Sequence, residues 1–283
     1  MSAQARAFAK INLCLHAGER RADNYHALAS LVTFAESGDE LRAEQSASLE
    51  LSIEGPFAAA TPKGRDNLVL KAANELRAAT GAKHGARLAL TKNLPVASGL
   101  GGGSADAAAA LRLLNSLWRT GLDDNALAQL GRSLGADVPA CVHSRSALIE
   151  GIGEKIAPLA LPRLALLLVN PGVELSTAAV FAKLDDRRGA ELPPLPEFAD
   201  ASTLVTYLRD TGNDLEAPAK SLAPVIAECL SALSREPGCL LARMSGSGAT
   251  CFGIFEAEEA AAATRQKIAA AHPGWWTEST RTR

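Results

Sequence analysis

The stretch Pro95-Val-Ala-Ser-Gly-Leu-Gly-Gly-Gly-Ser104 separates two apolar segments of different periodicity. Residues 87–91 before it have the pattern of a short strand, and the alanine-rich residues after Ser104 have helical spacing as far as Trp118, with a C-cap expected at Gly121. Glycine reaches positive φ and allows a ligand close to the backbone, and a helix N-terminus offers unpaired N–H groups to an anion. A flexible linker is the alternative, but linkers seldom lie between a strand and a well-capped helix. The stretch therefore predicts a phosphate-binding loop that contains Pro95, Gly99, Gly101, Gly102, Gly103 and Ser104.

A cation for this loop must come from elsewhere in the chain, because no lysine precedes Ser104. Lys10 is the candidate: it lies on an alternating segment, residues 7–17, that places Asn12 on the same face. Asp137, in the turn before Pro139, is the candidate general base. Each has an ordinary alternative, since Lys10 can be a solvated lysine and Asp137 a helix N-cap.

The first half of the chain is expected to begin as an antiparallel meander. Its strands are predicted at residues 7–17, 28–34, 41–44 and 49–53, with a break at Ser37-Gly-Asp39. Asp66 or Asn67 can cap a following helix that ends before Gly81. A helix at 124–134 and a short helix opened by Pro139 complete this half.

The second half is expected after a boundary near residue 158, where prolines interrupt the pattern. A strand at 164–169 is followed by a helix from about Ser176, a proline-rich loop and two more helices. A strand pair around Met244-Ser-Gly-Ser-Gly248, a helix at 257–271 and a last strand follow. The glycines of that strand pair form either an ordinary tight hairpin or a second wall near the phosphates. Strands alternating with helices predict an α+β fold in two domains.

Composition excludes several classes of protein. The 283 residues carry a formal net charge of −2, so no positive field would gather nucleic acid. The five cysteines are odd in number and contain no CxxC pair, which signals neither disulfides nor zinc. No apolar run reaches membrane-spanning length, and the first residues lack the pattern of a secretory signal. We therefore expect a cytoplasmic protein that acts on a small molecule, as a monomer or weak homodimer, without nucleic-acid or membrane partners.

Together these segments resemble the GHMP kinase superfamily, which includes galactokinase, homoserine kinase and mevalonate kinase. The resemblance rests on Ala9-Lys-Ile-Asn-Leu13, Arg21-Ala-Asp-Asn-Tyr-His26, the glycine loop, Leu134-Gly-Ala-Asp-Val-Pro139 and Asn170-Pro-Gly-Val173. It implies an N-terminal domain, residues 1–158, with an antiparallel sheet and helices that bind ATP. It also implies a smaller ferredoxin-like C-terminal domain, residues 159–283, with the active site in the cleft between the two.

The resemblance further implies ATP-dependent phosphorylation of a hydroxyl group, with Mg²⁺ bridging the phosphates. Asp137 would accept the hydroxyl proton and Lys10 would stabilise the transferring group. The motifs match best the branch whose acceptor is a cytidine diphosphate-linked alcohol. Residues assigned to that acceptor are Asn12, Tyr25, His26, Thr177 and Phe181, and residues assigned near adenine are Asn67 and Lys92. No protein ligand of the metal is assigned, and Ser104 is the one suggestion.

Two other functions remain open on the sequence alone. A homoserine- or mevalonate-type kinase would share the loop and the base but would need no nucleobase pocket for its acceptor. A catalytically silent nucleotide-binding relative would keep the fold without the chemistry, although it would not need both Lys10 and Asp137.

Overall fold

The computed structural model describes residues 2–20, 26–184 and 189–283. The chain forms two compact units, each built from separate segments. Unit 1 comprises Met1–Lys10, Gly38–Val96 and Gly101–Ser144, and unit 2 comprises Ile11–Ser37, Ala97–Leu100 and Arg145–Arg283. The sequence predicted a single division after residue 158 instead, and that boundary stays a prediction. Within the described ranges, no helix is both long and apolar enough to cross a membrane.

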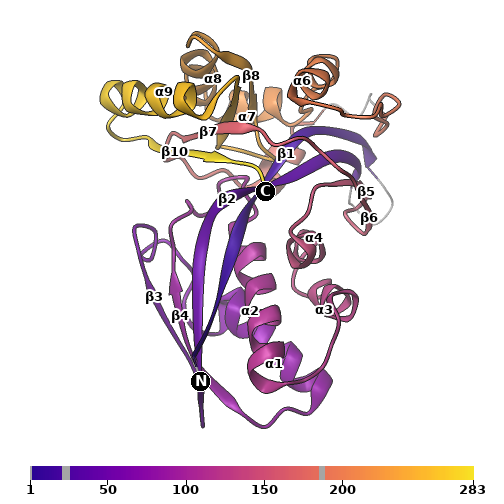
Figure 1. The fold of residues 1–283 in the computed structure, drawn as a ribbon, viewed down its shortest axis with the longest axis vertical. Coiled ribbons are helices and arrows are strands. Elements are labelled where there is room, and N and C mark those ends of the chain that lie inside the picture. The colour runs from indigo at the N-terminus through magenta and orange to yellow at the C-terminus, as the bar shows by residue number, and fades with distance from the viewer. Residues whose placement is uncertain (1, 21–25, 185–188) are drawn as a thin grey trace. The chain divides into compact units, whose positions relative to one another are not determined.

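Two long strands, β1 (Ser2–Arg20) and β2 (His26–Ser46), contribute residues to both units. In unit 1, β2 pairs antiparallel with β4 (Gly85–Thr91), which pairs in parallel with β3 (Leu49–Glu54). The helices of this unit lie on one face of these strands (Figure 1). They are the short 3₁₀ turn η1 (Gly64–Asp66), α1 (Leu68–Thr80), α2 (Gly102–Trp118), α3 (Asp124–Gly131) and α4 (Val138–His143).

Helix α2 is the centre of the helical layer in unit 1, because it packs against α1, α3 and α4. Ala105 and Ala107–Ala110 on this helix are all buried. Small side chains let neighbouring helices approach closely on several sides, which explains the alanine-rich sequence after the glycine loop. The packing fixes the N-terminal turn of α2, where that loop ends.

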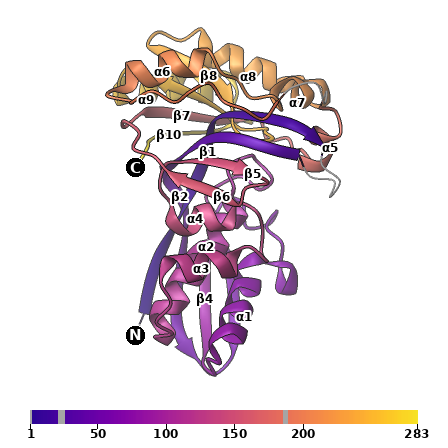
Figure 2. The same ribbon diagram turned by 90° about the vertical axis from the view of Figure 1, so that its right-hand side faces the viewer.

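Unit 2 contains a four-stranded antiparallel sheet in the order β10-β7-β9-β8. The strands are β7 (Ala165–Asn170), β8 (Cys239–Met244), β9 (Cys251–Phe255) and β10 (Trp276–Arg281). The helices are α5 (Thr177–Phe181), α6 (Ala201–Arg209), α7 (Glu216–Leu222), α8 (Val225–Ser234) and α9 (Glu258–Ala271). Figure 2 shows α8 and α9 with this sheet, on which they pack. The chain order and strand order are those of a ferredoxin-like arrangement, so that prediction is confirmed.

The core of unit 2 also includes residues of the two long strands. Leu15 and Ala17 of β1 lie in one buried cluster with Leu167 and Val169 of β7. The first part of β2 pairs with β5 (Ala147–Gly151), which pairs with β6 (Lys155–Pro158). The β5–β6 hairpin was missed in the sequence, where this region was treated as a boundary.

Three details of the predicted elements are wrong. The break expected at residues 37–39 does not exist, because β2 is continuous and a Cβ on Gly38 would lie 2.2 Å from the Ala7 oxygen. The glycine therefore permits close packing within a strand rather than a turn. Strand β3 is parallel to β4 because α1 connects them, and such a crossover returns the chain in the same direction. Three helices, α6, α7 and α8, occupy the region where two were expected.

Candidate functional site

The glycine loop ends in the first turn of α2, which begins at Gly102, two residues earlier than predicted. Gly99 and Gly101 have positive φ, +78° and +62°, as expected for a loop that curls its backbone. Gly102 and Gly103 are helical instead, so the expectation of positive φ there is wrong. Gly101 is the N-cap of α2, and the N–H groups of the turn that follows, which have no partner within the helix, are groups of the kind that bind an anion.

Lys10 and Asp137 form an ion pair within unit 1. The Lys10 Nζ donates to Asp137 Oδ1 at 2.8 Å, and the ammonium is buried while the Asp137 side chain is 43% exposed. Asp137 occupies the N-cap position of α4, as the alternative expected, but its side chain makes no capping hydrogen bond there. A Cβ on Gly101 would lie 3.3 Å from Lys10 Cε and 3.7 Å from Asp137 Oδ2. The loop therefore contacts the predicted catalytic pair directly.

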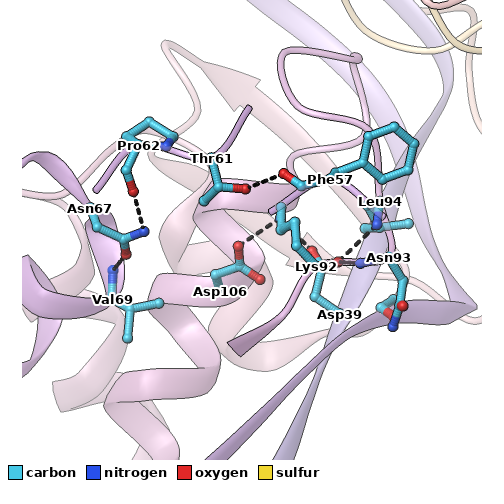
Figure 3. Close-up of polar contacts among 11 residues, drawn as sticks. Asp39, Phe57, Thr61, Pro62, Asn67, Val69, Lys92, Asn93, Leu94 and Asp106 are labelled. Atoms are coloured by element: carbon cyan, nitrogen blue, oxygen red, sulfur yellow. Dashed lines mark hydrogen bonds and ion pairs between the residues drawn. The ribbon is translucent and has the colours of Figure 1, made fainter. Parts of the chain in front are cut away.

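Asn67 caps α1, and both the oxygen and the nitrogen of its side-chain amide form hydrogen bonds to backbone groups. Its Oδ1 accepts from the Val69 N–H and its Nδ2 donates to the Pro62 carbonyl, each at 2.8 Å (Figure 3). The sequence left Asp66 or Asn67 as the cap, and the structure selects Asn67. An additional contact with adenine stays a prediction.

Lys92 lies buried between two carboxylates, those of Asp39 and Asp106, and Figure 3 shows its side chain directed at both. The Lys92 Nζ donates to Asp106 Oδ2 at 2.7 Å and to Asp39 Oδ2. Burial by itself lowers the pKa of the Lys92 ammonium, but the two carboxylates outweigh burial and raise its pKa overall. The side chain predicted near adenine is thus held by unit 1 itself.

Asn12 and the second glycine cluster meet the other part of the loop within unit 2. The Asn12 N–H donates to Ser245 Oγ at 3.1 Å, and Ser245 Oγ donates to the Gly99 carbonyl at 3.0 Å. The Asn12 amide donates to Ser30 Oγ at 2.8 Å. A Cβ on Gly99 would lie 2.3 Å from the Ser245 carbonyl oxygen, so only glycine fits there. The turn at 245–248 connects two strands and also lies against the glycine loop.

The predicted acceptor residues come together in part. The rings of His26 and Phe181 stack with centroids 5.4 Å apart, and the His26 Nδ1 donates to the Gly18 carbonyl at 2.9 Å. Thr177 shares a hydrogen bond of 2.8 Å with Ser247 in the 245–248 turn. Tyr25 lies outside the described residues. Pro95 is buried at the start of the loop, while Gly103 is exposed on the first turn of α2.

Several residues that build this site were not predicted from the sequence. Asn213 donates through its amide to the carbonyls of Met244 and Gly246, each at 2.8 Å, and so holds the turn that contacts Gly99. Asp39 looked like part of a turn beside Gly38. Asp106 had a visible signal, because it is a charged residue inside an otherwise apolar alanine-rich helix.

No group of three or more histidine, cysteine, aspartate or glutamate side chains that could hold a metal occurs among the described residues. Mg²⁺ keeps several waters and is usually bound by phosphates and one or two protein oxygens. The Ser104 hydroxyl, in the first turn of α2, is a protein oxygen of the required kind at the loop.

Two stretches of the chain match known families. Residues 67–145 match the family described as GHMP kinases N terminal domain, and residues 195–274 match GHMP kinases C terminal. The 4-diphosphocytidyl-2-C-methyl-D-erythritol kinase of Parvibaculum lavamentivorans is 56% identical over 95% of this chain and 94% of its own. The enzyme of the same name from Cereibacter sphaeroides is 52% identical over 96% of each chain.

Solved structures agree with these sequence relatives. A crystal structure of 4-(cytidine 5'-diphospho)-2C-methyl-D-erythritol kinase superposes with a TM-score of 0.82 at 33% identity, covering 99% of this chain and 100% of that one. Homoserine kinase from Cytophaga hutchinsonii superposes with a TM-score of 0.72 at 18% identity, covering 100% of this chain and 94% of that one, which shows a shared fold.

The fold and the glycine loop define this chain as a GHMP kinase. Its sequence identity of 56% and 52% to relatives of one name, over almost the full length, places it in a particular family within this superfamily. The chain belongs to the 4-diphosphocytidyl-2-C-methyl-D-erythritol kinase family.

Proposed function

We propose that the protein transfers the γ-phosphoryl group of ATP to the 2-hydroxyl of 4-(cytidine 5'-diphospho)-2-C-methyl-D-erythritol. The products are ADP and the 2-phosphate, an intermediate of non-mevalonate isoprenoid synthesis. The observation that carries the proposal is the Lys10–Asp137 ion pair in contact with Gly101 of the glycine loop. Membership of the family, with about half of the residues identical, supports the choice of acceptor.

This reaction requires little covalent chemistry from the protein, because phosphoryl transfer depends on positioning and charge stabilisation. The acceptor oxygen forms a bond to the γ-phosphorus as the bond to the β–γ bridging oxygen breaks, and ADP leaves. The hydroxyl proton passes to Asp137, whose Oδ1 is engaged by Lys10 and whose Oδ2 lies toward Gly101. The Lys10 ammonium orients this carboxylate and offers positive charge to the transferring group.

The triphosphate is assigned to the N-terminal turn of α2. Backbone N–H groups of Gly102, Gly103 and Ser104 are unpaired within the helix and, with the helix dipole, favour anionic oxygens. Mg²⁺, held by the Ser104 hydroxyl and phosphate oxygens, would neutralise phosphate charge. Asn67 and Lys92 support the adenine end in this proposal.

The acceptor base is assigned to the aromatic pair of unit 2. Phe181 offers a ring face for stacking, and Tyr25 is proposed as the opposite wall. The His26 Nδ1 donates to the Gly18 carbonyl, and the other ring nitrogen, Nε2, is proposed to contact the exocyclic amine of cytosine. Asn12 and Thr177 complete the proposed acceptor contacts.

The deciding experiment measures ADP release by the full chain with the cytidyl acceptor and, separately, with homoserine, mevalonate and galactose. We expect turnover with the cytidyl acceptor and a value of kcat/KM far below it for the other three. Faster turnover with one of those alcohols would replace the proposed acceptor. ATP binding without turnover on any of them would favour a catalytically silent relative.

A further inference from the structure

Two buried carboxylates that flank Lys92, those of Asp39 and Asp106, have no part in the proposed function. Asp39 lies on β2, Lys92 follows the last residue of β4, and Asp106 lies on α2. Their side chains are 0%, 3% and 4% exposed, respectively. We call these three residues the Lys92 cluster. It joins a strand, a loop and a helix of unit 1 through one ammonium group.

The Lys92 cluster contacts the backbone on both sides of the glycine loop, before Pro95 and at Gly102, and both places belong to unit 1. At the leading end, Asp39 Oδ1 accepts from the N–H groups of Asn93 and Leu94 at 2.6 and 2.8 Å, while its Oδ2 binds Lys92 (Figure 3). These bonds fix the backbone immediately before Pro95. One aspartate thus fixes the direction in which the chain enters the loop.

At the trailing end, the cluster contacts the first turn of α2. Gly102 and Asp106 are four residues apart and therefore lie on the same helix face. A Cβ on Gly102 would lie 3.1 Å from Lys92 Nζ and 3.7 Å from Asp39 Oδ2, so the absence of a side chain lets the ammonium lie against the helix start. One turn further along α2, Asp106 accepts a hydrogen bond from the same Lys92 ammonium.

The position of the Asp106 carboxylate depends on its hydrogen bond with Lys92. Its Oδ2 accepts from Lys92, whereas its Oδ1 is buried with no hydrogen-bond partner among the residues that the structure describes. Desolvation offsets most of the attraction in buried ion pairs, so apolar residues of similar size are often as stabilising. Such a cluster is therefore poorly explained by stability alone.

We propose that Asp39 and Asp106 are positioning residues that hold Lys92 and the first turn of α2 so that the loop binds the triphosphate. The inference rests on the proposed function, because it assigns the loop to ATP. The N–H groups of that turn must point at the phosphate oxygens, and a shift of about 1 Å in such a group is enough to lose much of its effect. The role is indirect, since neither carboxylate needs to touch the nucleotide.

The test measures the Kd for ATP by calorimetry on the full chain, with the acceptor Kd and the melting temperature recorded for every variant. Asp106→Ala removes the acceptor for Lys92, and Asp39→Asn replaces a carboxylate that accepts three hydrogen bonds with an amide that has one acceptor atom. We expect each to raise the Kd for ATP roughly tenfold or more while the acceptor Kd stays unchanged. Asp106→Asn keeps an oxygen for Lys92 and is expected to restore most of the ATP affinity.

Glu40→Gln is the matched control, because Glu40 is the next residue on β2 and pairs with Arg6 near the surface. It should leave the Kd for ATP unchanged. Wild-type affinity in folded Asp106→Ala or Asp39→Asn would overturn the proposal. Loss of the folded state in both would also overturn it, because the cluster would then serve stability. Should Asp106→Ala alone fail to fold, Asp39→Asn decides.

The inference and the proposed function fail in different measurements. Wild-type turnover with the cytidyl acceptor tests the function, whereas the ratio of ATP dissociation constants between variant and wild type tests the cluster. A wild type that binds ATP but phosphorylates another alcohol would refute the acceptor and leave the cluster's role intact.

Discussion

At the scale of single residues, the two members of the Lys10–Asp137 pair differ in their exposure to solvent. The ammonium is buried, whereas the carboxylate is partly exposed and can receive a proton from a bound molecule. Removing the carboxylate charge weakens an ion pair whose ammonium is buried, which is costly. The pair therefore combines a chemical role with a local structural one, and substitutions must separate the two.

Asp137→Asn is expected to lower kcat by roughly 10²–10⁴-fold, the usual contribution of a positioned base. The amide oxygen can still accept from Lys10, so the fold and acceptor binding should largely survive. Lys10→Ala should reduce kcat by a similar factor, and the double variant should fall well short of the product of the two effects because the residues act as a unit. Steady-state kinetics with melting curves check this; near-wild-type kcat in either folded single variant removes that residue from the mechanism.

A second prediction concerns pH and the Asp106 carboxyl. Burial raises its pKa from 3.8 to about 7, although Lys92 lowers it and Asp39 raises it further. The folded state thus binds more protons than the unfolded chain between these two values, so the free energy of unfolding contributed by this group falls as pH rises across that interval. Asparagine cannot titrate in this way.

Wild type should therefore lose stability relative to Asp106→Asn as the pH rises from about 4 to about 7. Denaturant unfolding of both proteins at several pH values measures the difference, and other titrating groups cancel because the two chains share them. Parallel pH profiles for the two proteins would mean that Asp106 does not titrate abnormally.

At the scale of elements, the glycine loop is a place where the backbone itself limits the side chain. Gly101 has positive φ, and a methyl group there would press on Lys10 Cε at 3.3 Å. Gly121, after α2, also has positive φ, +77°, but has nothing within 4 Å of its Cβ position. Both glycines have left-handed backbone, but their neighbours differ.

Gly101→Ala and Gly121→Ala should both lose about 1–2 kcal/mol of stability, the cost of left-handed backbone for an L-residue. Only Gly101→Ala should also reduce kcat/KM for ATP, by roughly tenfold or more, because it displaces the ammonium and the helix start. Kinetics and denaturant unfolding of both variants separate the effects. Equal kcat/KM values for both would show that the loop tolerates a side chain beside Lys10.

Periodicity predicted most elements but not how they pair. The alanine-rich helix follows from spacing and the ferredoxin-like second half from the family resemblance, and both are confirmed. The break expected at Gly38 is wrong because its reason lies in the strand across from it, at Ala7. Likewise, the parallel pairing of β3 depends on a crossover that local propensity does not encode.

The candidate site was predictable where residues lie in motifs and not where contacts are tertiary. Lys10 and Asp137 are 127 positions apart, yet each stands in a recognisable motif, and the structure joins them. Asp39 and Asp106 belong to no motif that signals a partner, and their common contact, Lys92, lies 53 and 14 positions away from them, respectively. Sequence reasoning predicted the two members of the Lys10–Asp137 pair and missed the two carboxylates that contact Lys92.

At the scale of the whole molecule, the proposed tasks divide between the two units. Unit 1 holds the proposed catalytic pair, the start of α2 and the Lys92 cluster, whereas unit 2 holds Asn12 and the His26–Phe181 stack. Substitutions should therefore separate the two substrates in kinetics. Those in the aromatic pair should act on the acceptor, and those in the Lys92 cluster should act on ATP.

Phe181→Ala is expected to raise the KM for the cytidyl acceptor roughly tenfold, because base stacking on an aromatic ring contributes ~1–3 kcal/mol. The KM for ATP should stay close to wild type. Phe181 also packs against the core of unit 2, so Phe198→Ala, which removes a ring that packs edge-on against Tyr207 in the same unit, is the control for lost packing. A similar rise in the acceptor KM in that control would assign the effect to stability.

The base edge provides the sharper measurement. A site built to hydrogen-bond cytosine leaves polar groups unmatched when uracil replaces it, so wild type should reject the uridine analogue far more strongly than a lost methylene would predict. His26→Ala should weaken use of the cytidine substrate and narrow the gap between the two bases, since the proposed acceptor atom is gone. The comparison is kcat/KM for the cytidine and uridine acceptors in wild type and His26→Ala. Equal use of both bases by wild type would refute cytosine recognition and return the homoserine- and mevalonate-type acceptors to consideration. An unchanged preference for cytidine in His26→Ala would instead mean that another residue recognises the base.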